Sequence, residues 1–219
     1  MNREEALTTG IISDQELIAR ILQGEKNLYA VILRRYNQRL YRVGMSIIND
    51  EAEVEDAMQA AYINAYENLG KFAFRATFPT WLTRILINEC LLRLKKRRQS
   101  IILNDDSMEK AIKEQQTGGP KTPVMEMINS ELKSILEASI RKLPEIYRTV
   151  FVMREIENTN VAETKECLSI SEINVKVRLN RAKVMLREML AASYRKEDIL
   201  HFHLSRCNRL VEMVMKNIG

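Results

Sequence analysis

The sequence predicts an all-α fold with two small helical domains joined by a flexible linker, the second containing a helix-turn-helix. Only 7 glycines and 4 prolines occur in 219 residues, which is low for a fold built on tight β-turns. Apolar residues recur at helical spacing along most of the chain, and no segment alternates with period two for long enough to be a convincing strand. A stretch rich in Asp, Gly and Pro at residues 99–127 interrupts the periodicity and is interpreted as the linker.

Composition limits the class of protein. A net charge of +5 and a pI near 9.1 favour a polyanionic partner. The three cysteines, Cys90, Cys167 and Cys207, are far apart and odd in number, which favours a reducing compartment over a disulfide framework. The N-terminus has no signal-peptide pattern, and no apolar run approaches the roughly 20 residues that span a bilayer. We therefore expect a cytoplasmic protein that does not contact a membrane.

The chain divides into five expected segments. Ser13 and Glu16 have capping-box spacing at the first helix, Gly70 is expected to end the third, and Pro144 suits a first helical position. The segments are a disordered N-terminus (1–12), a first helical domain (13–98), the linker (99–127), a helix-turn-helix domain (128–192) and an amphipathic tail (193–219). After the first helix, further helices are expected near 27–48, 51–69, 80–98, 106–114, 124–141, 144–157, 160–168, 171–192 and 204–217.

The sharpest local pattern is a helix-turn-helix over residues 160–183. Asn160 and Glu163 have capping-box spacing, and the turn at 169–171 ends in Ser171, which can cap a second, basic helix. In that helix Ile173, Val177 and Val184 are expected to face the core. Such a helix enters the major groove, with base edges near its N-terminus and phosphates farther along. The candidates are Ser171, Glu172 and Asn174 for bases and Lys176, Arg178, Arg181 and Lys183 for phosphates; an ordinary surface helix with a solvated basic face is the alternative.

Aromatic and basic residues lie close together in the range 71–98. Four aromatics, at 72, 74, 78 and 81, fall within ten positions, and five of the six residues at 93–98 are basic. Aromatic rings stack on unstacked bases and cations hold the backbone, so this pattern favours single-stranded nucleic acid. For Phe78 and Trp81 a place in the core is the preferred interpretation, and the basic run can be a solvated helix end.

Two clusters contain side chains of the types that bind metals, but neither cluster is expected to bind one. Residues 50–56 carry five carboxylates, which also suit a helix N-terminus. In the tail, His201, His203 and Cys207 offer three ligands where structural zinc usually takes four. An amphipathic helix with Cys207, Leu210, Val211 and Val214 on one face is the preferred interpretation. No cofactor is expected.

In their order and separation, these pieces resemble the extracytoplasmic-function (ECF) sigma factors of bacterial RNA polymerase. The run from Glu55 to Gln59 is similar to the "EDxxQ" stretch of the family's promoter-melting domain, and Phe78–Leu82 is similar to its "FSTWL" stretch. The segment after Leu143-Pro144, including Val175-Lys176-x-Arg178-Leu179, resembles the family's −35 domain. The resemblance covers about residues 13–98 and 128–192.

The resemblance implies a non-enzymatic protein for promoter recognition, DNA melting and transcription initiation. It implies that Asp56 and Gln59 dock on the polymerase β′ subunit, and that the loop at 70–78 captures a flipped base of the −10 strand. The −10 candidates are Phe72, Phe74, Arg75, Trp81, Arg84, Asn88, Lys95, Lys96, Arg97 and Arg98. The implied partners are core RNA polymerase (β′ and β subunits), promoter DNA and an anti-sigma factor.

Two alternatives belong to other classes of protein. The first is a helix-turn-helix regulator whose N-terminal domain senses a signal or dimerises; such a domain needs neither an aromatic loop nor a neighbouring basic run. The second is an enzyme acting on nucleic acid. The sequence offers it no nucleophile–base constellation and no Gly-rich phosphate loop, because the only histidines lie in the tail.

We predict that the isolated chain binds promoter DNA poorly. Two weak modules on a linker bind a split site well only when a scaffold sets their separation. Fluorescence anisotropy of a promoter duplex at physiological salt, with and without core polymerase, measures the difference. Tight and specific binding by the isolated chain would contradict the prediction.

Overall fold

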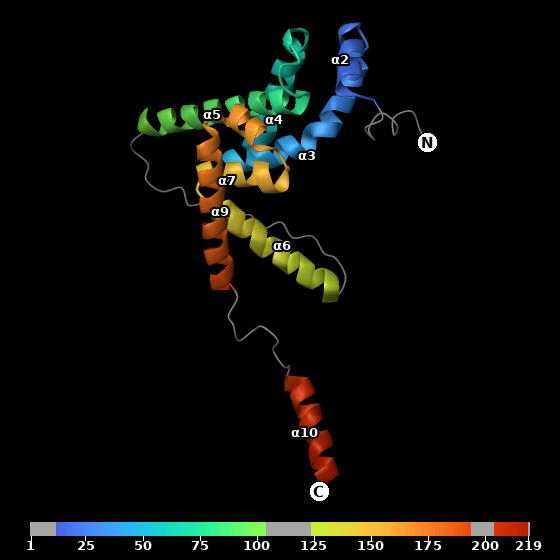
Figure 1. Ribbon diagram of the computed structural model, residues 1–219, viewed down its shortest axis with the longest axis vertical. Coiled ribbons are helices and arrows are strands. Elements are labelled where there is room, and N and C mark those ends of the chain that lie inside the picture. Colours follow the sequence, from blue (N-terminus) through green and yellow to red (C-terminus); the bar gives the residue numbers. More distant parts are fainter. Residues whose placement is uncertain (1–11, 104–123, 194–203, 219) are drawn as a thin grey trace.

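The computed structural model describes residues 12–103, 124–193 and 204–218, and every regular element in these ranges is helical, as expected (Figure 1). The first module comprises α2 (Asp14–Leu22), η1 (Lys26–Leu28), α3 (Tyr29–Ile47), α4 (Glu51–Glu67), η2 (Leu69–Lys71) and α5 (Phe78–Leu103). The second comprises α6 (Val124–Lys142), α7 (Glu145–Phe151), η3 (Val152–Ile156), α8 (Val161–Leu168) and α9 (Glu172–Ser193); α10 (Leu204–Ile218) follows. The expected disordered N-terminus, apart from residue 12, and the expected short helix at 106–114 lie outside the described residues.

Polar caps set where four of the helices begin. In each, a side-chain oxygen accepts a hydrogen bond from the backbone N–H three residues later, which satisfies a free donor of the first turn. The pairs are Ser13–Glu16 (3.2 Å), Asp50–Glu53 (3.0 Å), Asn160–Glu163 (2.8 Å) and Ser171–Asn174 (3.2 Å). The Glu163 carboxylate also accepts from the Asn160 N–H, so the predicted capping box is present there.

The prediction that Gly70 ends the third helix is wrong. α4 stops at Glu67, and the side-chain amide of Asn68 donates to the Asn64 carbonyl at 2.9 Å. Gly70 lies in the following 3-10 turn, η2, and has no left-handed backbone. The backbone N–H of Asn68 donates to the same carbonyl at 3.1 Å, so Asn68 closes the last turn of α4 without a glycine.

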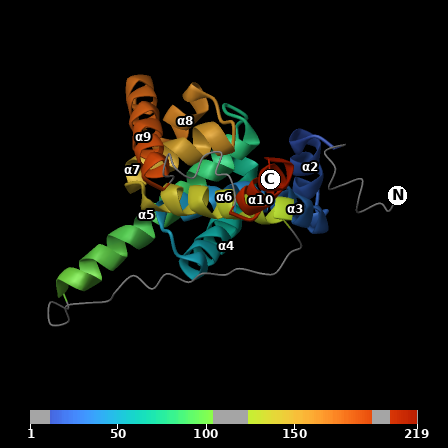
Figure 2. The ribbon, with the colours of Figure 1, turned by 90° about the horizontal axis from the view of Figure 1, so that it is seen from below.

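α5 is longer than predicted. It begins at Phe78 because Pro79 fits the first helical turn, where its missing N–H costs nothing. It continues to Leu103, and α6 begins at Val124, so helix extends into both ends of the range predicted as linker. The rest of that range, 104–123, lies outside the described residues. Figure 2 shows the C-terminal end of α5 projecting from the rest of the first module and from the second.

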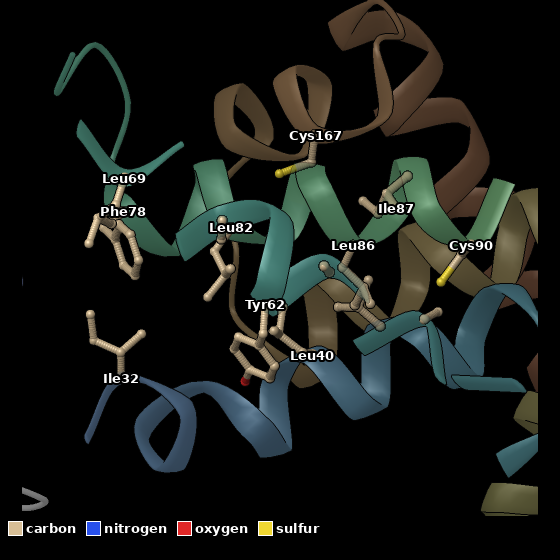
Figure 3. Packing of buried hydrophobic residues seen from close by; sticks show 14 of the residues in the cluster. Ile32, Leu40, Tyr62, Leu69, Phe78, Leu82, Leu86, Ile87, Cys90 and Cys167 are labelled. Carbon is tan, nitrogen blue, oxygen red and sulfur yellow. The ribbon is translucent and has the colours of Figure 1, made fainter. Parts of the chain in front are cut away.

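The main core lies between α3, α4 and α5 (Figure 3). Leu40, Leu82 and Leu86 are fully buried there. α3 and α4 pack closely at Gly44, where an added Cβ would lie 2.7 Å from Cγ1 of Val54. A larger residue at position 44 would therefore push the two helices apart.

The second module has a smaller core, and one prediction about it is wrong. Ile173, Val177 and Val184 were expected inside, yet they are 72%, 41% and 39% exposed. Instead α9 buries Val175, Ala182 and Leu186, of which Ala182 and Leu186 pack in one cluster with residues of α6 and α7. α9 carries two apolar stripes, and the position of its neighbours decides which one is buried. Two further differences concern the helix expected at 144–157. Pro144 caps α7 instead of occupying its first helical position. The π-helical turn η3 follows directly after α7.

The two modules pack against each other. Met153 and Cys167 of the second module belong to the core of the first. Arg148, only 8% exposed, extends from α7 to the end of α3, where its Nε donates to the Ser46 carbonyl at 2.6 Å and its Nη2 to the Ile47 carbonyl at 3.3 Å. Its Nη1 donates to two carbonyls of its own module, those of Arg141 (2.8 Å) and Leu143 (3.2 Å).

We predict that Arg148→Met lowers the free energy of unfolding by about 3 kcal/mol, because buried carbonyls in both modules lose a charged donor. Arg34→Met is the matched control, since Arg34 is an exposed arginine of α3. Urea denaturation followed by circular dichroism measures both variants. Equal stability of the two would show that the Arg148 contacts contribute nothing.

Candidate nucleic-acid interface

The aromatic loop, residues 72–77 between η2 and α5, is the most unusual segment of the first module. Phe74 is 50% exposed and has a φ of 54°, a left-handed conformation that costs a non-glycine residue about 1–3 kcal/mol. Its ring lies on Phe72, with centroids 4.6 Å apart. The loop borders a hollow of about 680 Å³ that Phe74, Arg75 and Phe78 help to line. Strain concentrated at an exposed ring beside a hollow indicates a binding site.

Two of the predicted aromatic platforms do not present their faces freely. Phe72 is 7% exposed and packs between Phe74, Phe78 and Trp81, so in this conformation it supports the loop and offers no face to a base. Trp81 is half-buried, with its ring centroid 5.0 Å from that of Phe72. Phe78 belongs to the core, as the preferred interpretation expected. The reason is size: four neighbouring rings bury more apolar area by packing together than by facing water.

Helical spacing aligns the next candidates along α5. Trp81, Arg84, Asn88, Leu92 and Lys95 follow one another three or four residues apart; we call them the α5 stripe. Arg84, Asn88 and Lys95 are exposed, so the structure brings these three predicted residues together. Leu92, between Asn88 and Lys95 in the stripe, is 53% exposed, and the prediction did not include it. The sequence signal that could have identified Leu92 is its helical spacing from Asn88 and Lys95.

The basic residues at 93–98 do not form one continuous surface. Arg93 and Arg97 turn toward α4, where Nη1 of Arg93 lies 3.6 Å from Asp56 and Nη1 of Arg97 lies 3.7 Å from Glu53. Lys95 and Lys96 are exposed, and the side chain of Arg98 lies outside the described ones. Arg97 therefore faces acids of its own chain, which sets it apart from the stripe.

α4 presents a stripe of its own on the first module. Asp56, Gln59 and Ile63 follow one another at three- and four-residue spacing, and all three are exposed. Gln59 and Ile63 border a mainly apolar hollow of about 720 Å³ between α3 and α4. Ile63, 55% exposed, is a residue that sequence reasoning missed. A polar edge beside an apolar hollow is typical of a protein–protein contact.

α9 presents an exposed apolar stripe flanked by polar residues. Asn174 and Arg181 lie on one flank of the stripe formed by Ile173, Val177 and Val184, and Lys176 and Lys183 lie on the other.

Several of the predicted α9 contacts already have partners. Arg181 donates to the Tyr147 hydroxyl at 3.2 Å, Lys183 lies 2.9 Å from Glu155, and Glu172 accepts from Lys165 at 3.1 Å. Arg178 is half-buried, whereas the prediction placed it outward.

α8 of the second module lies against the aromatic loop. Thr77 Oγ1 donates to Glu163 Oε1 at 3.3 Å, and the Cys167 thiol donates to the Thr80 carbonyl at 3.5 Å. Glu163 and Glu166 both line the hollow of the loop. Two carboxylates therefore lie next to the aromatic loop, which is predicted to bind DNA, a polyanion.

Charges continue across the contact between the modules. Arg42 of α3 lies 3.0 Å from Glu157, and Arg39 donates to the Thr159 hydroxyl at 3.3 Å. Arg84 and Glu166 line a shared hollow of about 540 Å³. In the Arg42–Glu157 and Arg84–Glu166 pairs the first module supplies the cation and the second supplies the anion, so this part of the contact is electrostatically complementary.

Two buried cysteines mark this arrangement. Cys90 lies inside the first module, and Cys167 lies between the modules (Figure 3). Burial raises the pKa of both thiols to about 12, so both are protonated at neutral pH. Among the described residues no group of three metal-ligating side chains occurs, and His201, His203 and the Cys207 side chain lie outside them. None of the described helices combines the length and apolarity that a membrane crossing requires.

Comparison with known proteins identifies the family that the two modules match. Sigma-70 region 2 matches residues 32–100, and sigma-70 region 4 matches residues 133–186. The chain is 29% identical over 176 residues to the ECF RNA polymerase sigma factor SigW of Bacillus subtilis, covering 79% of this chain and 94% of that protein. It is 26% identical over 175 residues to the ECF RNA polymerase sigma-E factor of Escherichia coli K12, covering 78% and 91%.

Solved structures share the fold. CnrH in complex with the cytosolic domain of CnrY matches with a TM-score of 0.57 at 22% identity, covering 83% of this chain and 99% of that one. The sigma factor RpoE in complex with the anti-sigma factor NepR from Bartonella quintana matches with a TM-score of 0.60 at 16% identity, covering 76% and 98%.

The chain belongs to the ECF sigma factors of bacterial RNA polymerase. Its function is promoter recognition and transcription initiation, and proteins of this family are not enzymes. The match of region 2 to the first module excludes the alternative of a sensing or dimerisation domain at that place.

Proposed function

We propose that the aromatic loop and the α5 stripe hold the unstacked −10 strand of the promoter. Phe74 carries this proposal, because it is a half-exposed ring in a strained backbone at the edge of a hollow. A ring so placed suits stacking on an extruded base, which offsets part of the cost of unstacking. Arg75 lines the same hollow, and Arg84, Asn88 and Lys95 are exposed along α5, where they would hold the strand's backbone.

α9 is the proposed reader of the −35 duplex. Ser171 caps the helix, and Asn174 and the strongly exposed Ile173 lie in its first turn, where base edges are reached. A branched apolar side chain there suits contact with a thymine methyl group. Lys176 is exposed on one flank for phosphate contact.

The α4 stripe is the proposed dock for the polymerase β′ subunit, through Asp56, Gln59 and Ile63 beside the apolar hollow. The sigma family binds core RNA polymerase, and we extend this to a second contact between the −35 module and the β subunit. The solved relatives are complexes with anti-sigma factors or, for CnrH, with CnrY, which supports an anti-sigma partner for this chain. Because sigma factors act on RNA polymerase in the cytoplasm, we propose that this protein is cytoplasmic.

The described arrangement is proposed to be a closed, DNA-free state. α8 places Glu163 and Glu166 beside the hollow of the aromatic loop, where they would repel a DNA phosphate. The −10 strand can enter fully only when α8 moves away from α5. Binding to polymerase would supply the differential free energy for this opening.

We predict that Phe74→Ala lowers transcription from a fully duplex promoter by about 5- to 150-fold, because a base-stacking contact contributes about 1–3 kcal/mol. Start sites are first mapped with core polymerase on genomic DNA, and the variant is then tested on a promoter so found. Phe74→Tyr is the control that keeps the ring. An absence of sigma-dependent starts would refute the sigma activity itself.

A template melted in advance across the −10 element separates melting from other defects. On it, the loss caused by Phe74→Ala should shrink, because the DNA is already unstacked. An equal loss on both templates would exclude a role for Phe74 in strand capture.

We also predict that Cys167 becomes reactive in the promoter-bound holoenzyme, while Cys90 stays protected. Opening moves α8 off α5 and exposes Cys167, whereas Cys90 remains in the core of the first module. Maleimide labelling at pH 7, with sites resolved by mass spectrometry, compares the free chain with the complex. Continued protection of Cys167 in an initiating complex would contradict the proposed opening.

A further inference from the structure

An apolar groove crosses the second module between α6, α7 and α9. Its volume is about 660 Å³, and Leu136, Phe151, Leu186 and Leu190 line it. Leu136 is 38% exposed, so part of the groove faces water. Leaving apolar area in water forgoes about 25 cal/mol for each Å² that could be buried, and such grooves mark binding surfaces.

α10 presents the complementary feature. Leu210, Val211 and Val214 lie on one face of the helix, and each is about half exposed, at 49%, 54% and 48%. Figure 1 shows α10 standing apart from both modules. A helix of 15 residues is marginal in water without tertiary packing, so a stable α10 requires a surface to cover this face.

The groove and the helix are close along the chain. Leu190 lines the groove in the last turns of α9, which ends at Ser193, and α10 begins at Leu204. The ten residues between them can span up to about 35 Å, and α10 is about 22 Å long. The groove is therefore within reach of α10 of the same chain, at an effective concentration of about millimolar.

The comparisons set this helix apart from the shared part of the family. The region 4 match ends at residue 186, before α10. The alignment with SigW takes in 94% of that protein but 79% of this chain. About a fifth of this chain thus has no counterpart there, and α10 lies beyond both family matches.

We propose that α10 folds back along α9 and inserts Leu210, Val211 and Val214 into the groove as a fifth helix of the second module. One exposed apolar face meets one apolar groove, and the tether favours the chain's own helix over a second copy. A two-stranded coil of α10 with itself would have only 15 residues from each chain, too short to be stable alone. A helix seated in this groove would exclude any other helical partner from it.

Hydrogen exchange of the full chain tests this docking. In the wild type, the amides of residues 210–216 should exchange at least about tenfold more slowly than an unstructured chain. Val211→Asp on the helix and Leu136→Asp in the groove should each abolish this protection. Arg209→Asp on the polar side of α10 and Ser134→Asp on the far side of α6 are the matched controls, and both should retain it.

Several outcomes would overturn the proposal. Unprotected α10 amides in the wild type would show that the helix does not dock. Protection that persists in Leu136→Asp would show that α10 docks at another surface, provided that circular dichroism shows the variant to be folded. Protection lost on dilution, together with a dimeric mass by light scattering, would identify a second copy as the occupant. Protection that is independent of concentration in a monomer, and lost in both variants, is the expected result.

Discussion

The contact of Arg148 with the end of α3 is the interaction on which the arrangement of the two modules depends. A helix ends in carbonyls that lack partners and carries partial negative charge there, so a buried cation is stabilised at that position. Arg148 uses this by donating to Ser46 and Ile47 while also holding two carbonyls of its own module. Because α7 is anchored in this way, α8 lies over α5, and Cys167 reaches the Thr80 carbonyl.

The same charges suit the closed arrangement and the binding of DNA. Arg39, Arg42 and Arg84 make one side of the first module basic, as a surface for phosphates must be. In the described conformation, carboxylates of the second module, including Glu157 and Glu166, occupy this side. In the proposed closed state, promoter DNA and the second module would compete for one electrostatic surface. The contact between the modules combines ion pairs such as Arg42–Glu157 with the buried side chains of Met153 and Cys167.

The family, the helix-turn-helix and most helices could be predicted from the sequence, because their signals are local. Caps such as Ser13, Asn160 and Ser171 act over three residues and were found where expected. The exposed side of α5 was also predictable in part, since Arg84 and Asn88 are one turn apart. The buried stripe of α9 was not, because its two apolar stripes fit a helix equally well. The pairing of Arg97 with Glu53 joins residues 44 positions apart, beyond any local pattern.

By itself, the sequence determined the helical class, the order of the modules and the residue types available at each surface, since these depend on spacing within a few turns. Only the tertiary structure decided that Phe72 is a support and Phe74 the exposed ring, because packing of four rings selects which face remains free. It also decided that α8 lies against the aromatic loop, through Thr77 and Glu163. That placement depends on a buried guanidinium meeting the end of a helix about a hundred residues earlier in the chain, a contact that no local preference encodes.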